Sequence, residues 1–175
     1  LKIEWSFIMD RRKRKTQQGI TDTFYQLLQK KAYEEISVSQ ICQLTDINRV
    51  TFYLHFIDKY DLLEKSIRHE MDELIHYCEA DGGNNNQQKI ERTFEYVDHH
   101  RERLSKLFKA DKQGFFAHVQ LEYLSQQLVD VPELTAIFFT HGLMGLLEHY
   151  LTCDVSKKEI AEILENITTA FSPSN

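Results

Sequence analysis

The chain has 175 residues, of which 42% are hydrophobic and 27% are charged, enough for one ordinary core or for a small module joined to a larger one. Only two prolines and six glycines occur, so long helices are expected rather than the frequent turns of an all-β protein. No segment of about 18 consecutive apolar residues is present, which predicts no membrane span. The three cysteines stand far apart, which argues against a disulfide framework or a cysteine-rich zinc site and favours a reducing cytoplasm.

The formal net charge of −6 is unevenly distributed. Residues 1–60 carry 10 Lys and Arg against 7 Asp and Glu, whereas residues 61–175 carry 11 against 20. A basic first third joined to an acidic remainder suits a protein that touches an anionic polymer at one end. Small domains also differ in charge by chance, so the motifs have to decide between these two explanations.

The N-terminal part of the chain is expected to contain a tail, a basic run and a helix. Residues 1–10 are interpreted as a disordered or artificially added tail, with Met9 as the natural first residue. The run Arg11–Lys15 is either an arm that reaches the minor groove or the phosphates of DNA, or a solubilising tail. Helical spacing follows, with Thr16 as a candidate cap. The apolar face of this helix consists of Ile20, Phe24, Leu27 and Leu28.

Two short helices are predicted next. Ser37 is expected to cap the first, because Gln40 stands three residues later, as in a capping box. Asp46 breaks the chain, and Asn48 is expected to cap the second helix, which runs to Leu54. Two such helices joined by a tight turn are the pattern of a helix-turn-helix, although helical hairpins of other kinds share it.

The second short helix has side chains suited to DNA. Arg49, Thr51 and Tyr53 are expected to be exposed, whereas Val50 and Phe52 can pack inward. Arg49 can pair with a guanine, and Thr51 can meet a phosphate or a thymine methyl group. Hydroxyl, imidazole and ammonium groups nearby can bind phosphates, as can the amino end of the first helix. The predicted DNA-binding residues are Ser37, Ser39, Asn48, Arg49, Val50, Thr51, Tyr53, His55 and Lys59.

The stretch Ser37–Phe56 closely resembles the DNA-binding motif of the TetR (tetracycline repressor) family. The resemblance rests on Thr51-Phe52-Tyr53-Leu54-His55-Phe56, followed by Asp58-Lys59-Tyr60-Asp61-Leu62-Leu63, and it covers about residues 16–65. It implies an all-α protein of about nine helices. A three-helix DNA-binding domain over residues 11–57 would precede a helical regulatory and dimerisation domain over residues 58–175.

Two positions depart from this family pattern. Asp46 stands in the turn where the family usually has glycine, and Asp tolerates the left-handed conformation better than most residues. Val50 stands where the family often has a smaller residue. The bulkier side chain there either alters recognition or simply packs.

The remainder of the chain is also expected to be helical. Asp58 is predicted to cap a long helix that runs to about Cys78, and an exposed loop, Asp81–Asn86, follows it. Further helices are expected at about 87–98, 99–109, 113–129, 133–151 and 157–171.

One face of the helix at 133–151 contains two glycines, each of which costs roughly 1 kcal/mol relative to alanine in a helix interior. Close approach of another helix explains them, either within one subunit or across a dimer. Resemblance to the family favours the dimer and adds the last helix to the interface. A dimer would read a palindromic operator. The predicted interface residues are Phe138, His141, Gly142, Gly145, His149, Ile160, Ile163, Leu164 and Ile167.

The second domain is rich in aromatic residues, which family members often use to line a pocket for a small-molecule effector. Aromatic residues at helical spacing are also ordinary core. Some family members with short regulatory domains act through a protein co-regulator instead. The candidate pocket residues are Phe94, Phe108, Phe116, Tyr123 and Phe139.

Catalysis and metal binding are not predicted. His69, Glu73 and His76 share a helical face, but no further strong ligand stands nearby, so surface histidines are the simpler interpretation. The nucleophile-elbow, phosphate-loop and dinucleotide-binding motifs do not occur, which predicts no enzyme activity and no cofactor. The sequence therefore predicts a cytoplasmic, homodimeric DNA-binding regulator, a repressor by family default. The alternative is a helical interaction or co-regulator module that has lost DNA or ligand binding.

Overall fold

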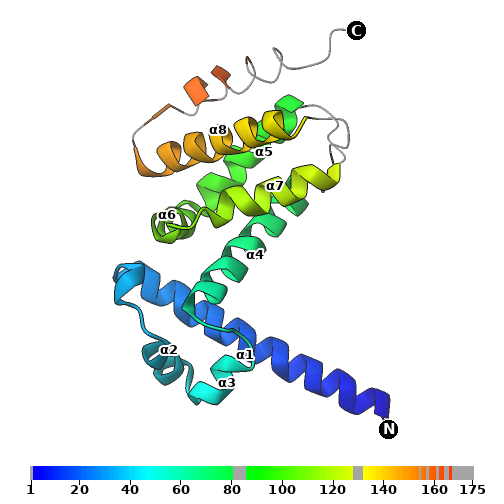
Figure 1. Ribbon diagram of the computed structural model, residues 1–175, viewed down its shortest axis with the longest axis vertical. Helices are drawn as coiled ribbons and strands as arrows, with labels where there is room; N and C mark the ends of the chain where they lie inside the picture. The colour runs from blue at the N-terminus through cyan, green and yellow to red at the C-terminus, as the bar shows by residue number, and fades with distance from the viewer. Residues whose placement is uncertain are drawn as a thin grey trace. The chain divides into compact units, whose positions relative to one another are not determined.

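The computed structural model describes residues 2–80, 86–127, 132–153, 155–156, 158–160, 162–163 and 166. Within these residues there are eight α-helices, one short 3-10 helix (η1) and no strand, which confirms the all-α prediction (Figure 1). The chain divides into two compact units, Leu1–Ser66 and Ile67–Asn175. The boundary predicted from the sequence lies earlier, before Asp58. The division falls inside α4 (Lys59–Glu79), so one helix belongs to both units.

Helix α1 (Lys2–Lys30) includes residues 2–10, which the sequence assigned to a tail. The prediction that Thr16 caps this helix is wrong. Thr16 lies inside α1, and its hydroxyl donates to the backbone carbonyl of Arg12 at 3.1 Å. The basic run Arg11–Lys15 is helical and exposed. The predicted apolar face is confirmed, because the side chains of Ile20, Phe24, Leu27 and Leu28 are all buried.

The N-terminal unit continues with η1 (Tyr33–Glu35), α2 (Val38–Thr45), α3 (Arg49–Tyr53) and the start of α4. Helix α1 packs on α2, and α2 packs on α3 (Figure 1). Every one of these segments contributes to a single core, in which each large side chain stabilises the fold by roughly 1.5–3 kcal/mol. The most deeply buried members are Ile20, Phe24, Ile36, Ile41, Phe52, Phe56, Leu62 and Leu63.

The C-terminal unit contains the rest of α4 with α5 (Asn86–His99), α6 (Arg101–Ala110), α7 (Phe115–Gln127) and α8 (Glu133–Thr152). Helix α8 packs on α6 and α7, and α5 packs on α6. Aromatic pairs fill part of this core. The rings of Phe108 and Phe116 stack at 3.9 Å between centroids, and Phe94 meets Tyr150 edge-on at 5.1 Å. The predicted loop Asp81–Asn86 lies outside the described residues except for Asn86, which begins α5.

A buried carboxylate ties α4 to α6 in this second unit. The side chain of Glu70 is 2% exposed, and its two oxygens face Arg103 at 2.9 Å from Nε and 2.9 Å from Nη2. The hydroxyl of Tyr96 donates to the same carboxylate at 3.4 Å. A carboxylate removed from water needs such partners, because an unpaired buried charge costs several kcal/mol.

Candidate nucleic-acid interface

The amino end of α2 is closed by the predicted capping box. The hydroxyl of Ser37 accepts from the backbone amide of Gln40 at 3.3 Å, and the side-chain oxygen of Gln40 accepts from the amide of Ser37 at 3.1 Å. Lys31 donates to the same oxygen at 2.8 Å. The Ser37 hydroxyl is therefore engaged within the domain. Ser39, in the first turn, is exposed.

The turn between α2 and α3 has the backbone geometry expected from its unusual residue. Asp46 has φ 56° and ψ 47°, the left-handed conformation that the family's glycine adopts more easily. The amide of Ile47 donates to the carbonyl of Cys42 at 3.0 Å, which closes the end of α2. Thr45 reinforces this end, because its hydroxyl bonds to the carbonyl of Ile41 at 2.8 Å and to Thr23 of α1 at 3.1 Å.

Helix α3 has five residues and is fixed at both its cap and its inner face. The side-chain oxygen of Asn48 accepts from the amide of Thr51 at 2.7 Å and from its hydroxyl at 3.0 Å, which confirms the predicted cap. Phe52 is fully buried, as predicted. The alternative that Val50 packs inward is wrong: its side chain is 70% exposed. Leu54, which follows the helix, is 71% exposed.

Arg49 and Tyr53 form the polar part of the exposed face of α3. They stand one turn apart, and a guanidinium nitrogen of Arg49 donates to the Tyr53 hydroxyl at 3.5 Å. Tyr53 is 49% exposed, and its ring also meets the buried Phe52 edge-on at 5.5 Å between centroids. The two side chains therefore point outward together and present a cation and a hydroxyl to any partner of α3.

His55 lies at the end of α3 and is half-buried. Burial lowers its pKa, and the charges of Lys13 and Lys65 lower it further. Its Nδ1 is buried and has no hydrogen-bond partner among the described residues. The lowered pKa disfavours the charged imidazolium, and because Nδ1 is buried, a phosphate can be bound only through Nε2.

Lys59 has a structural contact that the sequence did not reveal. Its ammonium donates to the backbone carbonyl of Tyr33 at 2.9 Å and lies 4.2 Å from the centroid of the Tyr33 ring. Burial lowers the pKa of Lys59, and the nearby carboxylate of Glu34 acts in the opposite direction. These contacts attach the start of α4 to η1, whatever else the cation binds.

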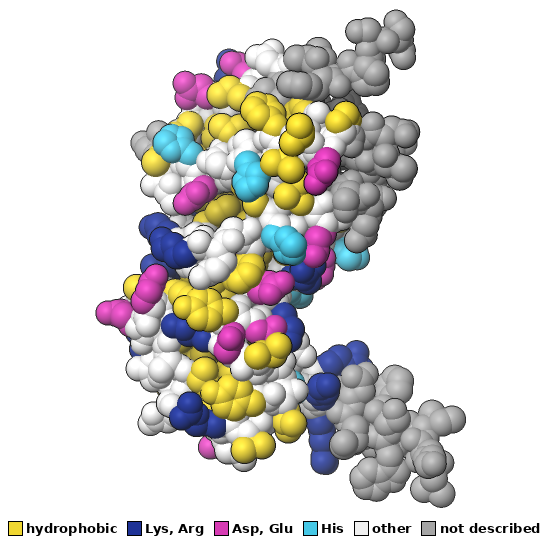
Figure 2. Space-filling view, in the orientation of Figure 1, with side chains coloured by type: hydrophobic (Ala, Val, Ile, Leu, Met, Phe, Trp, Pro, Cys, Tyr) yellow, Lys and Arg dark blue, Asp and Glu magenta, His cyan; other side chains and the backbone are white. Residues whose placement is uncertain are grey.

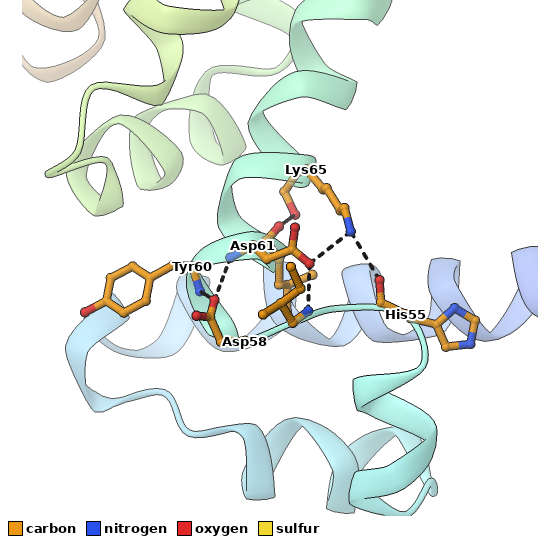
Figure 3. A network of polar contacts seen from close by, with 8 residues as sticks. His55, Asp58, Tyr60, Asp61 and Lys65 are labelled. Atoms are coloured by element: carbon orange, nitrogen blue, oxygen red, sulfur yellow. Dashed lines mark hydrogen bonds and ion pairs between the residues drawn. The ribbon is translucent and has the colours of Figure 1, made fainter.

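A network of polar contacts shapes the connection from α3 to α4 (Figure 3). Asp58 caps α4, as predicted, because its carboxylate accepts from the amides of Tyr60 and Asp61 at 2.8 Å each. Asp61 accepts from the amide of Ile57 at 2.8 Å and from Lys65 at 2.9 Å. Lys65 also donates to the carbonyl of His55 at 3.3 Å. The acidic-Lys-x-acidic run therefore fixes this turn and the position of α3.

The predicted dimer residues of α8 lie at the surface. Phe138 is 62% exposed, and His141, Gly142, Gly145 and His149 are exposed too. A side chain added at either glycine would meet no described residue within 4 Å. In the space-filling view, hydrophobic side chains come to the surface over α8 (Figure 2).

The predicted interface residues of the last helix lie in different surroundings. Ile163 is 44% exposed, whereas Ile160 is only 2% exposed and faces its own unit. The side chains of Leu164 and Ile167 lie outside the described residues.

The candidate pocket residues pack against neighbours in the C-terminal unit. Phe94 and Phe116 are buried in the aromatic pairs described above. Tyr123 donates its hydroxyl to Glu79 at 3.0 Å, and Phe139 meets Phe138 at 6.1 Å between ring centroids. Among the candidates, only Phe94 and Phe116 are therefore buried core residues, and a pocket for an effector stays a prediction.

The described residues contain no group of three or more His, Cys, Asp or Glu side chains that could hold a metal ion. In the same part of the chain, no helix combines the length and apolar character that a bilayer crossing requires.

Comparison with known proteins relates both the sequence and the fold to bacterial regulators. Residues 20–65 match the sequence model described as "Bacterial regulatory proteins, tetR family". A transcriptional activator of the dhaKLM operon in Lactococcus lactis, DhaS, is 33% identical over 116 residues, which are 65% of this chain and 60% of that protein. The chain therefore matches under two thirds of that relative's length.

Two solved structures share the fold. A TetR transcriptional regulator from Streptococcus agalactiae aligns with TM-score 0.66 and 20% identity over 93% of this chain and 98% of its own. A TetR-family regulator from Syntrophomonas wolfei aligns with TM-score 0.67 and 18% identity over 93% and 99% of the two chains. At these identities the likeness concerns the fold alone.

Proposed function

We propose that this chain, whose residues 20–65 match the tetR-family sequence model, is a transcriptional regulator of that family and binds a palindromic operator as a homodimer, with α3 in the major groove. The proposal rests on which side chains of α3 are buried and which are exposed. Its inner residue Phe52 is fully buried, while Arg49, Val50, Tyr53 and Leu54 are all exposed. A five-residue helix fixed so firmly, with its outer face free of covering side chains, is suited to entering a groove.

The phosphate contacts in this proposal come from groups around α3. The first-turn amides of α2, next to the exposed Ser39, can bind a phosphate, since the amino end of a helix favours anions. The Tyr53 hydroxyl and Nε2 of His55 are further donors. Lys59 keeps two ammonium protons beyond its bond to Tyr33. These contacts orient the domain, whereas the outer face of α3 reads bases.

The test uses the full-length chain and duplexes that it selects from a random-sequence library, together with the DNA upstream of its own gene. Gel shift with Arg49→Ala and Tyr53→Ala is expected to show at least tenfold weaker binding, because each substitution removes an exposed group of α3 without opening the core. Lys109→Ala, an exposed cation on α6, serves as the matched control. Unchanged binding by both α3 variants would reject α3 as the recognition surface. Failure of the parent chain to select any duplex would favour the helical interaction module.

The dimer in this proposal is formed through α8. Among the described residues, Gly142 and Gly145 have open space beside them, so packing against this part of the subunit does not explain why glycine occupies these positions. The neighbouring Leu134 and Phe138 are 79% and 62% exposed, which is unusual for large apolar side chains unless something covers them. A second copy of α8 would bury all four positions. Ile163 extends this face, whereas Ile160 does not.

Light scattering and analytical ultracentrifugation test the dimer at micromolar concentration. Gly145→Leu adds a side chain that the subunit accommodates but a closely packed partner helix does not, so a monomer is expected. Gly145→Ala is the matched control, expected to keep the dimer or weaken it slightly. A parent chain that is monomeric at this concentration would contradict the dimer. An unchanged dimer in the leucine variant would move the interface away from α8.

The proposal also covers whether the chain represses or activates transcription and what controls it. Repression is the family default, whereas the Lactococcus lactis relative is described as an activator. A reporter gene placed behind a selected operator distinguishes the two, since expression falls or rises when the chain is supplied. The chain acts on chromosomal DNA and so works in the cytoplasm. We propose that an effector or a co-regulator protein controls it, and that it has no catalytic activity.

A further inference from the structure

The outermost side chains of α3 are apolar. Val50 of α3 is 70% exposed, and Leu54, directly after the helix, is 71% exposed; the other large hydrophobic residues of α3, Phe52 and Tyr53, are less exposed. Hydrophobic side chains come to the surface over α2 and α3 in the space-filling view (Figure 2). Valine and leucine exposed on the proposed DNA-reading face require a specific apolar partner, because phosphates and most base edges are polar.

Helix geometry places these two side chains together. Successive residues of an α-helix are about 100° apart around its axis, so residues i and i+4 point the same way. Relative to the buried Phe52, Val50 lies about 200° behind and Leu54 about 200° ahead, which puts both opposite the core. Leu54 keeps helical backbone angles, φ −73° and ψ −18°, so the same rotation per residue applies to it. Arg49 and Tyr53 flank this line on one side.

The polar groups of α3 leave the centre of the face to these residues. Thr51 is half-buried, and its hydroxyl bonds to the cap residue Asn48 at 3.0 Å. Arg49 leans toward Tyr53, to which it donates at 3.5 Å. The part of α3 that would enter a groove deepest is therefore branched hydrocarbon, with one guanidinium beside it.

We propose that Val50 and Leu54 read the 5-methyl groups of thymines at the centre of each operator half-site. Among the groups that base pairs display in the major groove, the thymine methyl is the apolar one. Contact with it buries hydrocarbon on both partners, whereas cytosine lacks the methyl group and a phosphate is charged. The inference rests on the proposed DNA binding through α3, and it adds the class of base that the helix selects.

The experiment replaces single thymines by uracil in duplexes that the parent chain has selected. This exchange removes the methyl group and leaves base pairing unchanged. At the positions that Val50 and Leu54 contact, the parent chain is expected to bind the uracil duplex about three- to tenfold more weakly, as burial of one or two methyl groups implies. Thymines outside the half-sites are the internal control. Val50→Ala and Leu54→Ala are each expected to bind selected duplexes more weakly. Each should also lose the difference in affinity between thymine and uracil at one position.

Val50→Thr provides a matched variant of nearly the same shape, and since the side chain is exposed the fold is expected to tolerate it. It replaces one methyl group by a hydroxyl, so it should lower the thymine preference without loss of folding, which circular dichroism checks. If the chain selects no duplex, DNA binding itself fails. If it binds selected duplexes with equal affinity whether thymine or uracil is present, DNA binding stands and the methyl readout is rejected.

Discussion

The ammonium of Lys59 bonds to the backbone carbonyl of Tyr33 at 2.9 Å and lies 4.2 Å from the ring centroid of the same residue. One cation thus contacts both the main chain and the side chain of η1 and attaches α4 to it. The Tyr33 hydroxyl takes no part: it is buried and has no hydrogen-bond partner among the described residues. The ring and the carbonyl are what Lys59 requires.

Substitutions at these two positions should therefore affect the free energy of unfolding differently. Lys59→Met is expected to lower the free energy of unfolding by about 1–2 kcal/mol, since a charge-assisted hydrogen bond and a cation–π contact are lost. Tyr33→Phe keeps both contacts and removes a buried hydroxyl, so it should be neutral or raise that free energy by up to about 1 kcal/mol. Urea denaturation measures both. A large loss in the phenylalanine variant would show that the hydroxyl has a partner.

Asp46 offers a test of backbone strain. Because its φ is 56°, Asp46→Gly is expected to raise the free energy of unfolding by up to about 1 kcal/mol. Asp46→Ala should lower it by about 1 kcal/mol, since alanine lacks the local hydrogen bonding of Asp. The difference between the two variants in chemical denaturation is the quantity to compare. Equal stabilities would mean that this turn adopts another conformation in solution.

The basic run Arg11–Lys15 is exposed on α1, and Lys13 is close enough to lower the pKa of His55 at the end of α3. It therefore lies on the side of the N-terminal unit that carries α3. Replacing Arg12 and Lys13 by Gln is expected to weaken binding equally on selected and random duplexes. The slope of log affinity against log salt should also fall by about one for each lost contact. A change limited to selected duplexes would argue for base contacts instead.

The buried carboxylate of Glu70 and its partner Arg103, whose side chain is 37% exposed, are expected to respond non-additively to substitution. Arg103→Met removes the cation beside this carboxylate and is expected to lower the free energy of unfolding by about 1–2 kcal/mol, since solvent at Arg103 screens part of the attraction. Replacing both residues by Met removes the unpaired charge, so the double variant should recover most of that loss. Thermal denaturation of the parent, the two single variants and the double variant gives the coupling energy. Simple additivity would contradict an energetic coupling between Glu70 and Arg103.

The lowered pKa values of two histidines predict how the free energy of unfolding depends on pH. Burial lowers the pKa of His55 and of His100, with neighbouring lysines in the first case and Arg103 in the second adding to the effect. The unfolded chain, with histidine pKa values of about 6.5, therefore binds more protons than the folded chain below that pH. The free energy of unfolding should fall as pH drops from about 7 to 5. His55→Gln is expected to make that decline shallower, as urea denaturation at several pH values would show.

The features predicted correctly from the sequence are local. Ser37 with Gln40, Asn48 with Thr51, and Asp58 with Asp61 cap their helices through partners three residues away, and such spacing is visible in the chain itself. The buried face of α1 was predicted for the same reason, because helical periodicity over many residues identifies it. The cap predicted at Thr16 was wrong because its side chain suits a cap, whereas the helix begins well before it.

The features that were missed join residues far apart in sequence. Lys59 and Tyr33 are 26 positions apart, and Arg103 and Glu70 are 33 apart, so no local pattern reveals either contact. The orientation of the Val50 side chain was uncertain from the sequence for a different reason. A helix of five residues is too short for periodicity to decide between an inward and an outward side chain, and the answer came from the fixed position of Phe52.

The shortness of α3 has a consequence for its dynamics. A segment of five helical residues has no helical stability of its own in water, because forming the first turn costs more than so few hydrogen bonds return. Its order depends on the insertion of Phe52 and on the Asn48 cap. The hydrogen-bonded amides of Thr51 and Phe52 should therefore exchange with solvent only when the whole N-terminal unit opens. A peptide copied from this helix should be a random coil with no affinity for the operator.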